Sequence, residues 1–222
     1  MENWYPARGL DWAVSLLFPA KCLCCWERVP PDRLFCRECA EKLPEEPRRR
    51  LIRLDSGLEV PVLAPMEYEG GYRESMLQYK FRGCKIIGPR MGMLMAGLIE
   101  GLPELKWTLT YVPLSPEGFR RRGYDQNLLL ARQIGRQRGI EVRRLLEKVK
   151  KTRAQHDLGL EERLTNLSGA YRASEEAAGR NILLVDDIVT SGSTLRECAS
   201  ALFKAGANLV CCLCAAESKF RK

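Results

Sequence analysis

The chain has 222 residues, a formal net charge of +8 and a hydrophobic content of 45%. That length accommodates one domain of ordinary size plus a small appendage, and the apolar content excludes a disordered tail. No apolar run approaches the roughly 20 residues that span a bilayer, and the first residues lack the basic stretch of a secretory signal. We expect a cytoplasmic protein with no membrane span, and the basic charge favours anionic partners, either phosphorylated small molecules or nucleic acid.

A short helix is predicted over residues 10–18, and a block holding five of the ten cysteines follows it. The block contains two Cys-x-x-Cys pairs, Cys22 with Cys25 and Cys36 with Cys39. Four thiolates at this spacing can surround zinc with no open position, which predicts a structural site and not a catalytic one. Cys24 offers a further thiol, and a redox-active pair is the alternative interpretation.

The stretch LPEEPRRR has the prolines and mixed charge of a linker. We therefore expect residues 1–43 to form the N-terminal helix and zinc ribbon, residues 44–59 the linker, and residues 60–222 the main domain. The cysteine segment is too small to fold on apolar burial alone, so a metal would supply the stability that its core lacks.

The main domain alternates strands and helices, which indicates an α/β fold. In chain order we predict an extended segment over 60–68, helices over 71–81 and 89–100, a strand over 107–114, a helix over 124–139, a strand near residue 171, a strand over 182–185, a helix over 193–204 and a strand over 208–216. The runs ILLV and LVCCLC are apolar without alternation, as in parallel strands that are covered on both faces.

The segment ILLVDDIVTSGST, residues 182–194, carries the strongest functional pattern. Its apolar run delivers Asp186 and Asp187 to the carboxyl edge of the sheet, where open α/β folds bind ligands. A loop of small residues follows, namely Thr190, Ser191, Gly192, Ser193 and Thr194. Its backbone N–H groups and the start of the next helix suit a terminal phosphate, while the carboxylates suit sugar hydroxyls. The pattern predicts a ribose 5-phosphate site, and the signatures of dinucleotide and P-loop sites are absent from the segment.

This pattern resembles the phosphoribosyl-pyrophosphate loop of type I phosphoribosyltransferases. The resemblance implies that Asp186 and Asp187 bind the ribose hydroxyls and that residues 190–194 surround the 5-phosphate. The structural alternative is an Asp-Asp turn that caps the next helix, but it explains neither the second carboxylate nor the central glycine.

Phosphoribosyl transfer also needs cations at the pyrophosphate. The segment YVPLSPEGFRRRGYDQN, residues 111–127, could supply them directly or through Mg²⁺. The candidates are Ser115, Arg120, Arg121 and Arg122. An ordinary solvated loop is the alternative.

The polar segment over residues 150–171 suits a mobile lid that carries Arg153 or Lys151. Arg153 joins Asp186 and Asp187 as a candidate catalytic residue. The segment also holds His156, the single histidine, which we interpret as a surface residue in preference to a general acid.

The chain as a whole resembles the ComF family of competence-associated, phosphoribosyltransferase-like proteins. The resemblance rests on the four cysteines, on YEGGYRESMLQYKFRG, on VPLSPEGFRRRGYDQN, on TRAQ with the later Arg163 and Asn166, and on the phosphoribosyl-pyrophosphate loop. One departure is Asp125, because the family usually has asparagine there.

The resemblance implies a type I phosphoribosyltransferase-like parallel sheet flanked by helices, with an N-terminal zinc ribbon. It also implies a role in handling single-stranded DNA alongside a helicase-like ATPase. Tyr72, Tyr79 and Phe81 could stack on bases, although we favour packing of this helix onto the core. Two functions stay open: a Mg²⁺-dependent phosphoribosyltransferase with an unidentified acceptor, and a non-catalytic single-stranded nucleic-acid-binding accessory protein that keeps the ligand site for sensing or stability. A transcriptional regulator is a weaker third, since no DNA-reading helix pair is evident.

Overall fold

The computed structural model describes residues 20–150 and 169–219. The helix expected over residues 10–18 and most of the expected lid lie outside these ranges. Within them, no helix combines the length and the apolar character needed to cross a membrane.

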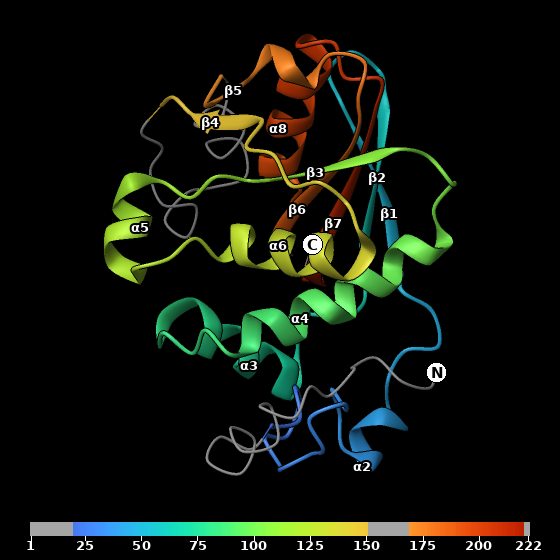
Figure 1. Cartoon of the computed structure of the whole chain (residues 1–222), viewed down its shortest axis with the longest axis vertical. Helices are drawn as coiled ribbons and strands as arrows, with labels where there is room; N and C mark the ends of the chain where they lie inside the picture. Colours follow the sequence, from blue (N-terminus) through green and yellow to red (C-terminus); the bar gives the residue numbers. More distant parts are fainter. Residues whose placement is uncertain (1–19, 151–168, 220–222) are drawn as a thin grey trace.

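A five-stranded sheet forms the centre of the fold, with the strand order β1-β2-β7-β6-β3 (Figure 1). Its strands are β1 (Arg48–Arg53), β2 (Glu59–Ala64), β3 (Trp107–Tyr111), β6 (Asn181–Val189) and β7 (Leu209–Glu217). β2, β7, β6 and β3 are parallel to one another, whereas β1 is antiparallel to β2. The predicted α/β fold with a mostly parallel sheet is therefore confirmed. A separate antiparallel pair joins β4 (Leu146–Lys148) to β5 (Tyr171–Ala173).

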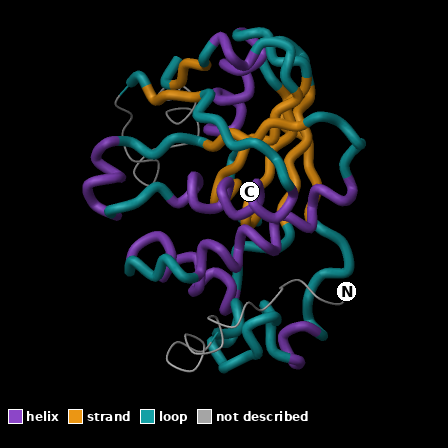
Figure 2. The backbone as a smooth tube through the Cα atoms, viewed as in Figure 1, coloured by secondary structure: helices purple, strands orange, loops and turns teal. Residues whose placement is uncertain are grey.

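Helices cover both faces of this sheet (Figures 1 and 2). The helices are α2 (Arg37–Ala40), α3 (Gly70–Phe81), α4 (Ile87–Ala96), α5 (Pro116–Arg122), α6 (Gln126–Arg138) and α8 (Ser193–Lys204), with short 3-10 turns η1 (Gly97–Gly101) and η3 (Glu175–Ala177). Leu183 and Val185 of β6 pack in the cluster that holds α3, α4 and α6, while Ile182 and Leu184 pack with α8. This two-sided burial explains why the run ILLV shows no alternation.

The cysteines of β7 follow the same rule. Cys211 packs on the α4 and α6 side, and Cys212 and Cys214 pack on the α8 side. All three are buried free thiols, and burial raises the pKa of each thiol. They act as small apolar residues of the core.

Strand β1 lies inside the segment that LPEEPRRR assigns to a linker. Both prolines of that stretch precede the strand, so the ladder with β2 needs no N–H group from them. Ile52 is buried, while the guanidinium of Arg48 pairs with Glu67 at 3.0 Å. The arginines made this edge strand difficult to predict from the sequence. Their charged ends pair or reach solvent, while the backbone remains in the sheet.

The four-cysteine segment with α2 lies at one end of the molecule, beyond α3 and α4 (Figures 1 and 2). The Ser75 hydroxyl of α3 donates to the carbonyl of Leu23 at 2.7 Å. Arg90 of α4 donates to the carbonyls of Lys21 and Arg33 at 3.0 and 2.6 Å. These contacts hold the cysteine segment against the main domain.

Candidate functional site

The two aspartates of the site lie near the end of β6, at the carboxyl edge of the sheet. Both are only 8% exposed. The Asp186 Oδ1 atom accepts hydrogen bonds from Asn127 Nδ2 of α6 and from the backbone N–H of Asp187, each at 2.9 Å. The Asp187 Oδ2 atom lies 2.9 Å from the Lys80 ammonium of α3. Each carboxylate is therefore held by a different helix.

Burial and the neighbouring Asp187 charge raise the pKa of Asp186 to about 7. In the unfolded chain an aspartate ionises near pH 4 (about 3.9). Between these two values the folded state binds more protons, so the contribution of Asp186 to the free energy of unfolding falls as the pH rises.

We expect Asp186→Asn to stabilise the fold more at about pH 8 than at about pH 5, because the amide never carries the buried charge. Urea unfolding of the parent and of the variant at both pH values measures this difference. A difference in stability that stays constant, or that shrinks on going to the higher pH, would contradict the burial of an ionisable Asp186.

The loop after β6 connects the strand directly to α8. Ser191, Gly192 and Ser193 form its turn, with Gly192 at φ +80° and the two serine hydroxyls 2.8 Å apart. α8 begins at Ser193, so its positive end faces the loop. A hollow here is lined by Asp186, Ile188, Val189, Thr190, Ser191, Gly192, Ser193, Thr194 and Leu195. One predicted carboxylate and the whole predicted phosphate loop thus line the same hollow.

The candidate cations of the segment over residues 111–127 have different surroundings. The Ser115 hydroxyl accepts from the backbone N–H of Gly118 at 3.0 Å and so caps the start of α5. Arg120 is exposed and lies 3.7 Å from Glu117 on the same helix. Arg122 is half-buried, and it donates to the Gln126 side chain at 2.8 Å.

Arg121 and Arg122 both lie over the ring of Phe81, with 5.9 and 5.4 Å from the guanidinium carbon to the ring centroid. Burial lowers the pKa of Arg122, and the nearby charge of Asp187 opposes that shift. Electrostatics therefore links Arg122 to Asp187.

The candidate lid residues Lys151, Arg153 and His156, and the motif residues Arg163 and Asn166, lie outside the described residues. The described residues on either side of this segment belong to β4 and β5, where Lys148 pairs with Tyr171. The two described strands that flank the segment are thus paired with each other.

Packing decides the role of two aromatic residues in α3. Tyr72 and Tyr79 are buried, and their hydroxyls donate to the backbone carbonyls of Ala215 and Gln126 at 3.1 and 2.8 Å. The prediction that these rings pack on the core is confirmed. Phe81, the last residue of α3, is instead 52% exposed.

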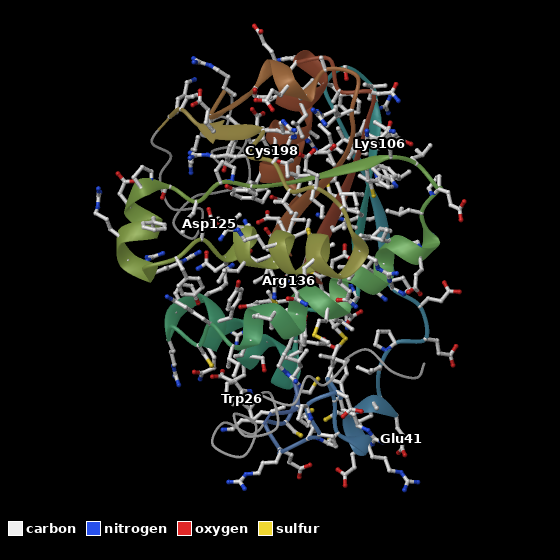
Figure 3. All side chains as sticks on the ribbon, viewed as in Figure 1. Trp26, Glu41, Lys106, Asp125, Arg136 and Cys198 are labelled. Carbon is white, nitrogen blue, oxygen red and sulfur yellow. The ribbon has the colours of Figure 1, made fainter. Side chains whose placement is uncertain are left out.

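Asp125 is the N-cap residue of α6 and stands on the short connection from α5 to α6 (Figure 3). Its Oδ1 atom accepts from the N–H of Leu128 at 3.1 Å and its Oδ2 atom from the N–H of Leu114 at 3.2 Å. Asparagine is an equally good helix cap but has a single carbonyl oxygen. The carboxylate therefore caps α6 and at the same time fixes the loop after β3.

Three further residues at the site were not assigned to it from the sequence, namely Arg50, Lys80 and Asn127. Lys80 and Asn127 stand in the two stretches that resemble the ComF family, but nothing in those stretches assigns them to a carboxylate. Arg50 stands in the expected linker.

The four cysteines of the two Cys-x-x-Cys pairs come together, with all four Sγ atoms within 4.8 Å of one another. The Sγ atoms of Cys25 and Cys36 are 3.5 Å apart. Zinc bound at about 2.3 Å by four thiolates separates the sulfurs by roughly 3.8 Å, so the cluster fits a closed structural zinc site. Cys24 is not part of the group.

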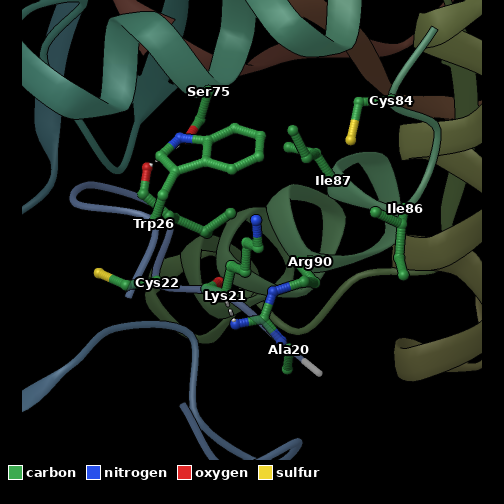
Figure 4. A pocket seen from close by; sticks show the side chains of 10 residues that line it. Ala20, Lys21, Cys22, Trp26, Ser75, Cys84, Ile86, Ile87 and Arg90 are labelled. Carbon is green, nitrogen blue, oxygen red and sulfur yellow. Dashed lines mark hydrogen bonds between the residues drawn. The ribbon is translucent and has the colours of Figure 1, made fainter. Parts of the chain in front are cut away.

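A second and larger hollow, of about 240 Å³, lies between the cysteine segment and helices α3 and α4 (Figure 4). Trp26, Leu23 and Ile87 supply much of its apolar lining, with Lys21 and Arg90 beside them. It shares no lining residue with the hollow at Asp186.

Comparison with known proteins relates the C-terminal part of the chain to a protein family. The family described as phosphoribosyl transferase domain matches residues 123–221, a range that includes α6, β6, α8 and β7. The site at the end of β6 therefore belongs to a domain of the phosphoribosyltransferase class.

Relatives extend this match over most of the chain. The DNA utilization protein YhgH of Escherichia coli (strain K12) is 32% identical over 208 residues, which cover 87% of this chain and 84% of the relative. Competence protein ComFC of Bacillus subtilis is 31% identical, with 77% of this chain and 67% of the relative covered. Competence protein F of Haemophilus influenzae is 36% identical over 46% of this chain and 48% of its own length. The chain belongs to the ComF family.

Proposed function

We propose that this chain binds phosphoribosyl pyrophosphate and transfers its phosphoribosyl group to an acceptor during DNA uptake. The observation that carries the proposal is the single hollow lined by Asp186 and residues 190–194. The phosphoribosyltransferase class of the domain and the competence names of its relatives support it.

In the proposed reaction the acceptor attacks C1 of the ribose, the bond from C1 to pyrophosphate breaks, and pyrophosphate leaves with the bonding electrons. Asp186 and Asp187 bind ribose hydroxyls, and the N–H groups of the loop with the positive end of α8 hold the 5-phosphate. Arg122 and Lys80 are the described cations that lie near the carboxylates, and both can offset the charge of the leaving group.

Magnesium prefers carboxylate and phosphate oxygens, so Asp186 and Asp187 fit the ion together with the ligand. When bound, Mg²⁺ would neutralise charge on the pyrophosphate. Arg153 and the pyrophosphate candidates Ser115, Arg120 and Arg121 remain part of this proposal, with Ser115 acting through its cap of α5.

Release of pyrophosphate tests turnover. The protein is incubated with Mg²⁺, phosphoribosyl pyrophosphate and a panel of nucleobases and small amines, and pyrophosphate is measured by a coupled assay. We expect release that depends on one acceptor class and that is lost in Asp187→Asn. Tight binding of phosphoribosyl pyrophosphate without release for any acceptor would favour a sensing role.

A second function has its own observation. Phe81 is exposed beside two guanidinium groups, and the chain carries a net charge of +8. Aromatic faces flanked by cations bind single-stranded nucleic acid. We therefore propose single-stranded DNA binding at Phe81 as the alternative, with a helicase-like ATPase as the partner that the family resemblance suggests.

Fluorescence anisotropy with a labelled single-stranded oligonucleotide at low salt tests the alternative. Phe81→Ser should weaken the binding of the oligonucleotide several-fold. Leu51→Ser is the control, because Leu51 is also an exposed apolar residue but lies in β1, and it should leave the affinity unchanged. Equal affinity of the parent and of Phe81→Ser would move DNA binding away from α3.

A further inference from the structure

Arg50 of β1 reaches across the edge of the sheet to the loop after β6. Its Nη2 atom donates to the backbone carbonyl of Thr190 at 2.9 Å. Its Nε atom lies 3.4 Å from Oε1 of Glu217, the last residue of β7. The side chains of Arg50 and Glu217 are 24% and 18% exposed, so the pair is shielded from much of the solvent. One guanidinium therefore joins β1, β7 and the loop.

We propose that Arg50 is a positioning residue of the phosphate loop, which turns the Thr190 carbonyl away from the bound anion. The inference rests on the proposed function, in which this loop binds a phosphate monoester. Arg50 does this through the loop backbone, because neither it nor its strand neighbour Ile52 lines the hollow.

The geometry of the peptide bond gives the reason. In a planar trans peptide the C=O and N–H groups point in opposite directions. A Thr190 carbonyl bonded to Arg50 therefore leaves the N–H of Ser191 pointing away from Arg50. A nest for an anion needs N–H groups turned inward and carbonyl oxygens turned outward, since a carbonyl oxygen repels phosphate.

Gly192 shows how closely β1 supports the loop. A Cβ atom on Gly192 would lie 2.8 Å from Ile52 Cδ1 and 3.0 Å from Arg50 Nη2. Residues of β1 thus form a wall behind the turn. The wall touches the turn closely, so the loop cannot move toward β1 unless the Ile52 and Arg50 side chains shift.

The test compares the parent with four variants by titration calorimetry with ribose 5-phosphate. Arg50→Met removes the donor and keeps an unbranched apolar stem in its place. Arg53→Met removes the same charge from the other face of β1, where Arg53 is exposed. Glu217→Gln weakens the ion pair at the sheet edge but leaves the bond from Arg50 to Thr190.

We expect Arg50→Met to lower the affinity for ribose 5-phosphate about tenfold, as the loss of one charge-assisted hydrogen bond implies. Arg53→Met and Glu217→Gln should stay within about twofold of the parent, and Arg50→Lys should recover part of the loss. An equal loss in Glu217→Gln would assign the effect to the sheet edge and overturn the proposal, as would unchanged affinity in Arg50→Met.

Amide hydrogen exchange of the ligand-free proteins separates this inference from the proposed function. Arg50→Met should speed exchange at Ser191 and Gly192 relative to Arg53→Met. If the parent fails to bind ribose 5-phosphate, the proposed function fails, while faster exchange still shows that Arg50 fixes the loop. Unchanged exchange would overturn the role of Arg50 whatever the ligand.

Discussion

Cys36→Ser is expected to lose zinc and to unfold the four-cysteine segment. Structural zinc sites of this kind contribute on the order of 10 kcal/mol of apparent binding free energy, and the described part of the segment buries few apolar side chains of its own. The loss should spread to α3 and α4, because Ser75 and Arg90 bond to carbonyls of the segment. Metal content, thermal unfolding and limited proteolysis measure the three effects.

Cys24→Ser is the matched control, since it makes the same change beside the first Cys-x-x-Cys pair. Cys24 lies outside the group of four, so this variant should keep its zinc and its resistance to protease. Loss of zinc in Cys24→Ser, or full zinc content in Cys36→Ser, would contradict the assignment of the four ligands.

Gly192→Ala is expected to abolish most of the phosphate affinity and to destabilise the fold by about 2 kcal/mol. The residue has φ +80°, which costs an L-residue roughly 1–2 kcal/mol. Its new Cβ would also press on Ile52 and Arg50 at 2.8 and 3.0 Å. Relief of that contact displaces the end of the Arg50 side chain, which weakens its bond to the Thr190 carbonyl. The strained backbone at residue 192 also shifts the N–H groups that the proposed function assigns to the phosphate. Calorimetry with ribose 5-phosphate and urea unfolding measure the two effects.

Gly206→Ala provides the control at the opposite end of α8. Gly206 has φ +87°, and its Cβ would meet Ala178 at the milder distance of 3.3 Å. We expect a similar cost in backbone strain with ribose 5-phosphate affinity unchanged. Equal affinity in Gly192→Ala and Gly206→Ala would show that the turn at residue 192 does not hold the ligand.

The central strands could be predicted well because each one shows as an apolar run within a short stretch of the sequence. β6 and β7 are apolar on both faces, and such runs follow from the parallel sheet itself. The Cys-x-x-Cys spacing likewise predicted the four sulfurs, although only the folded chain separates Cys24 from them.

Elements rich in charge were harder to predict. β1 has arginine at four of its six positions and sits at the sheet edge, so it shows the pattern of a linker. α5 ends in three arginines and was expected to be a loop, although Ser115 followed by proline is a recognisable helix start.

The partners of the carboxylates could not be predicted for a different reason. Lys80 and Asn127 reach Asp187 and Asp186 only because α3 and α6 pack on the same face of the sheet. No local sequence pattern predicts these contacts between helix and strand. The position of the aspartates could be predicted because they lie in the same strand as the apolar run that precedes them.

Binding of phosphoribosyl pyrophosphate tests the central claim most directly. Titration calorimetry with this ligand and Mg²⁺ is performed on the parent and on the double variant Asp186→Asn, Asp187→Asn. We predict binding by the parent and a loss of at least about tenfold in the variant, whose amides replace both buried carboxylates. Equal binding by the two proteins would contradict the assignment of the hollow at the end of β6.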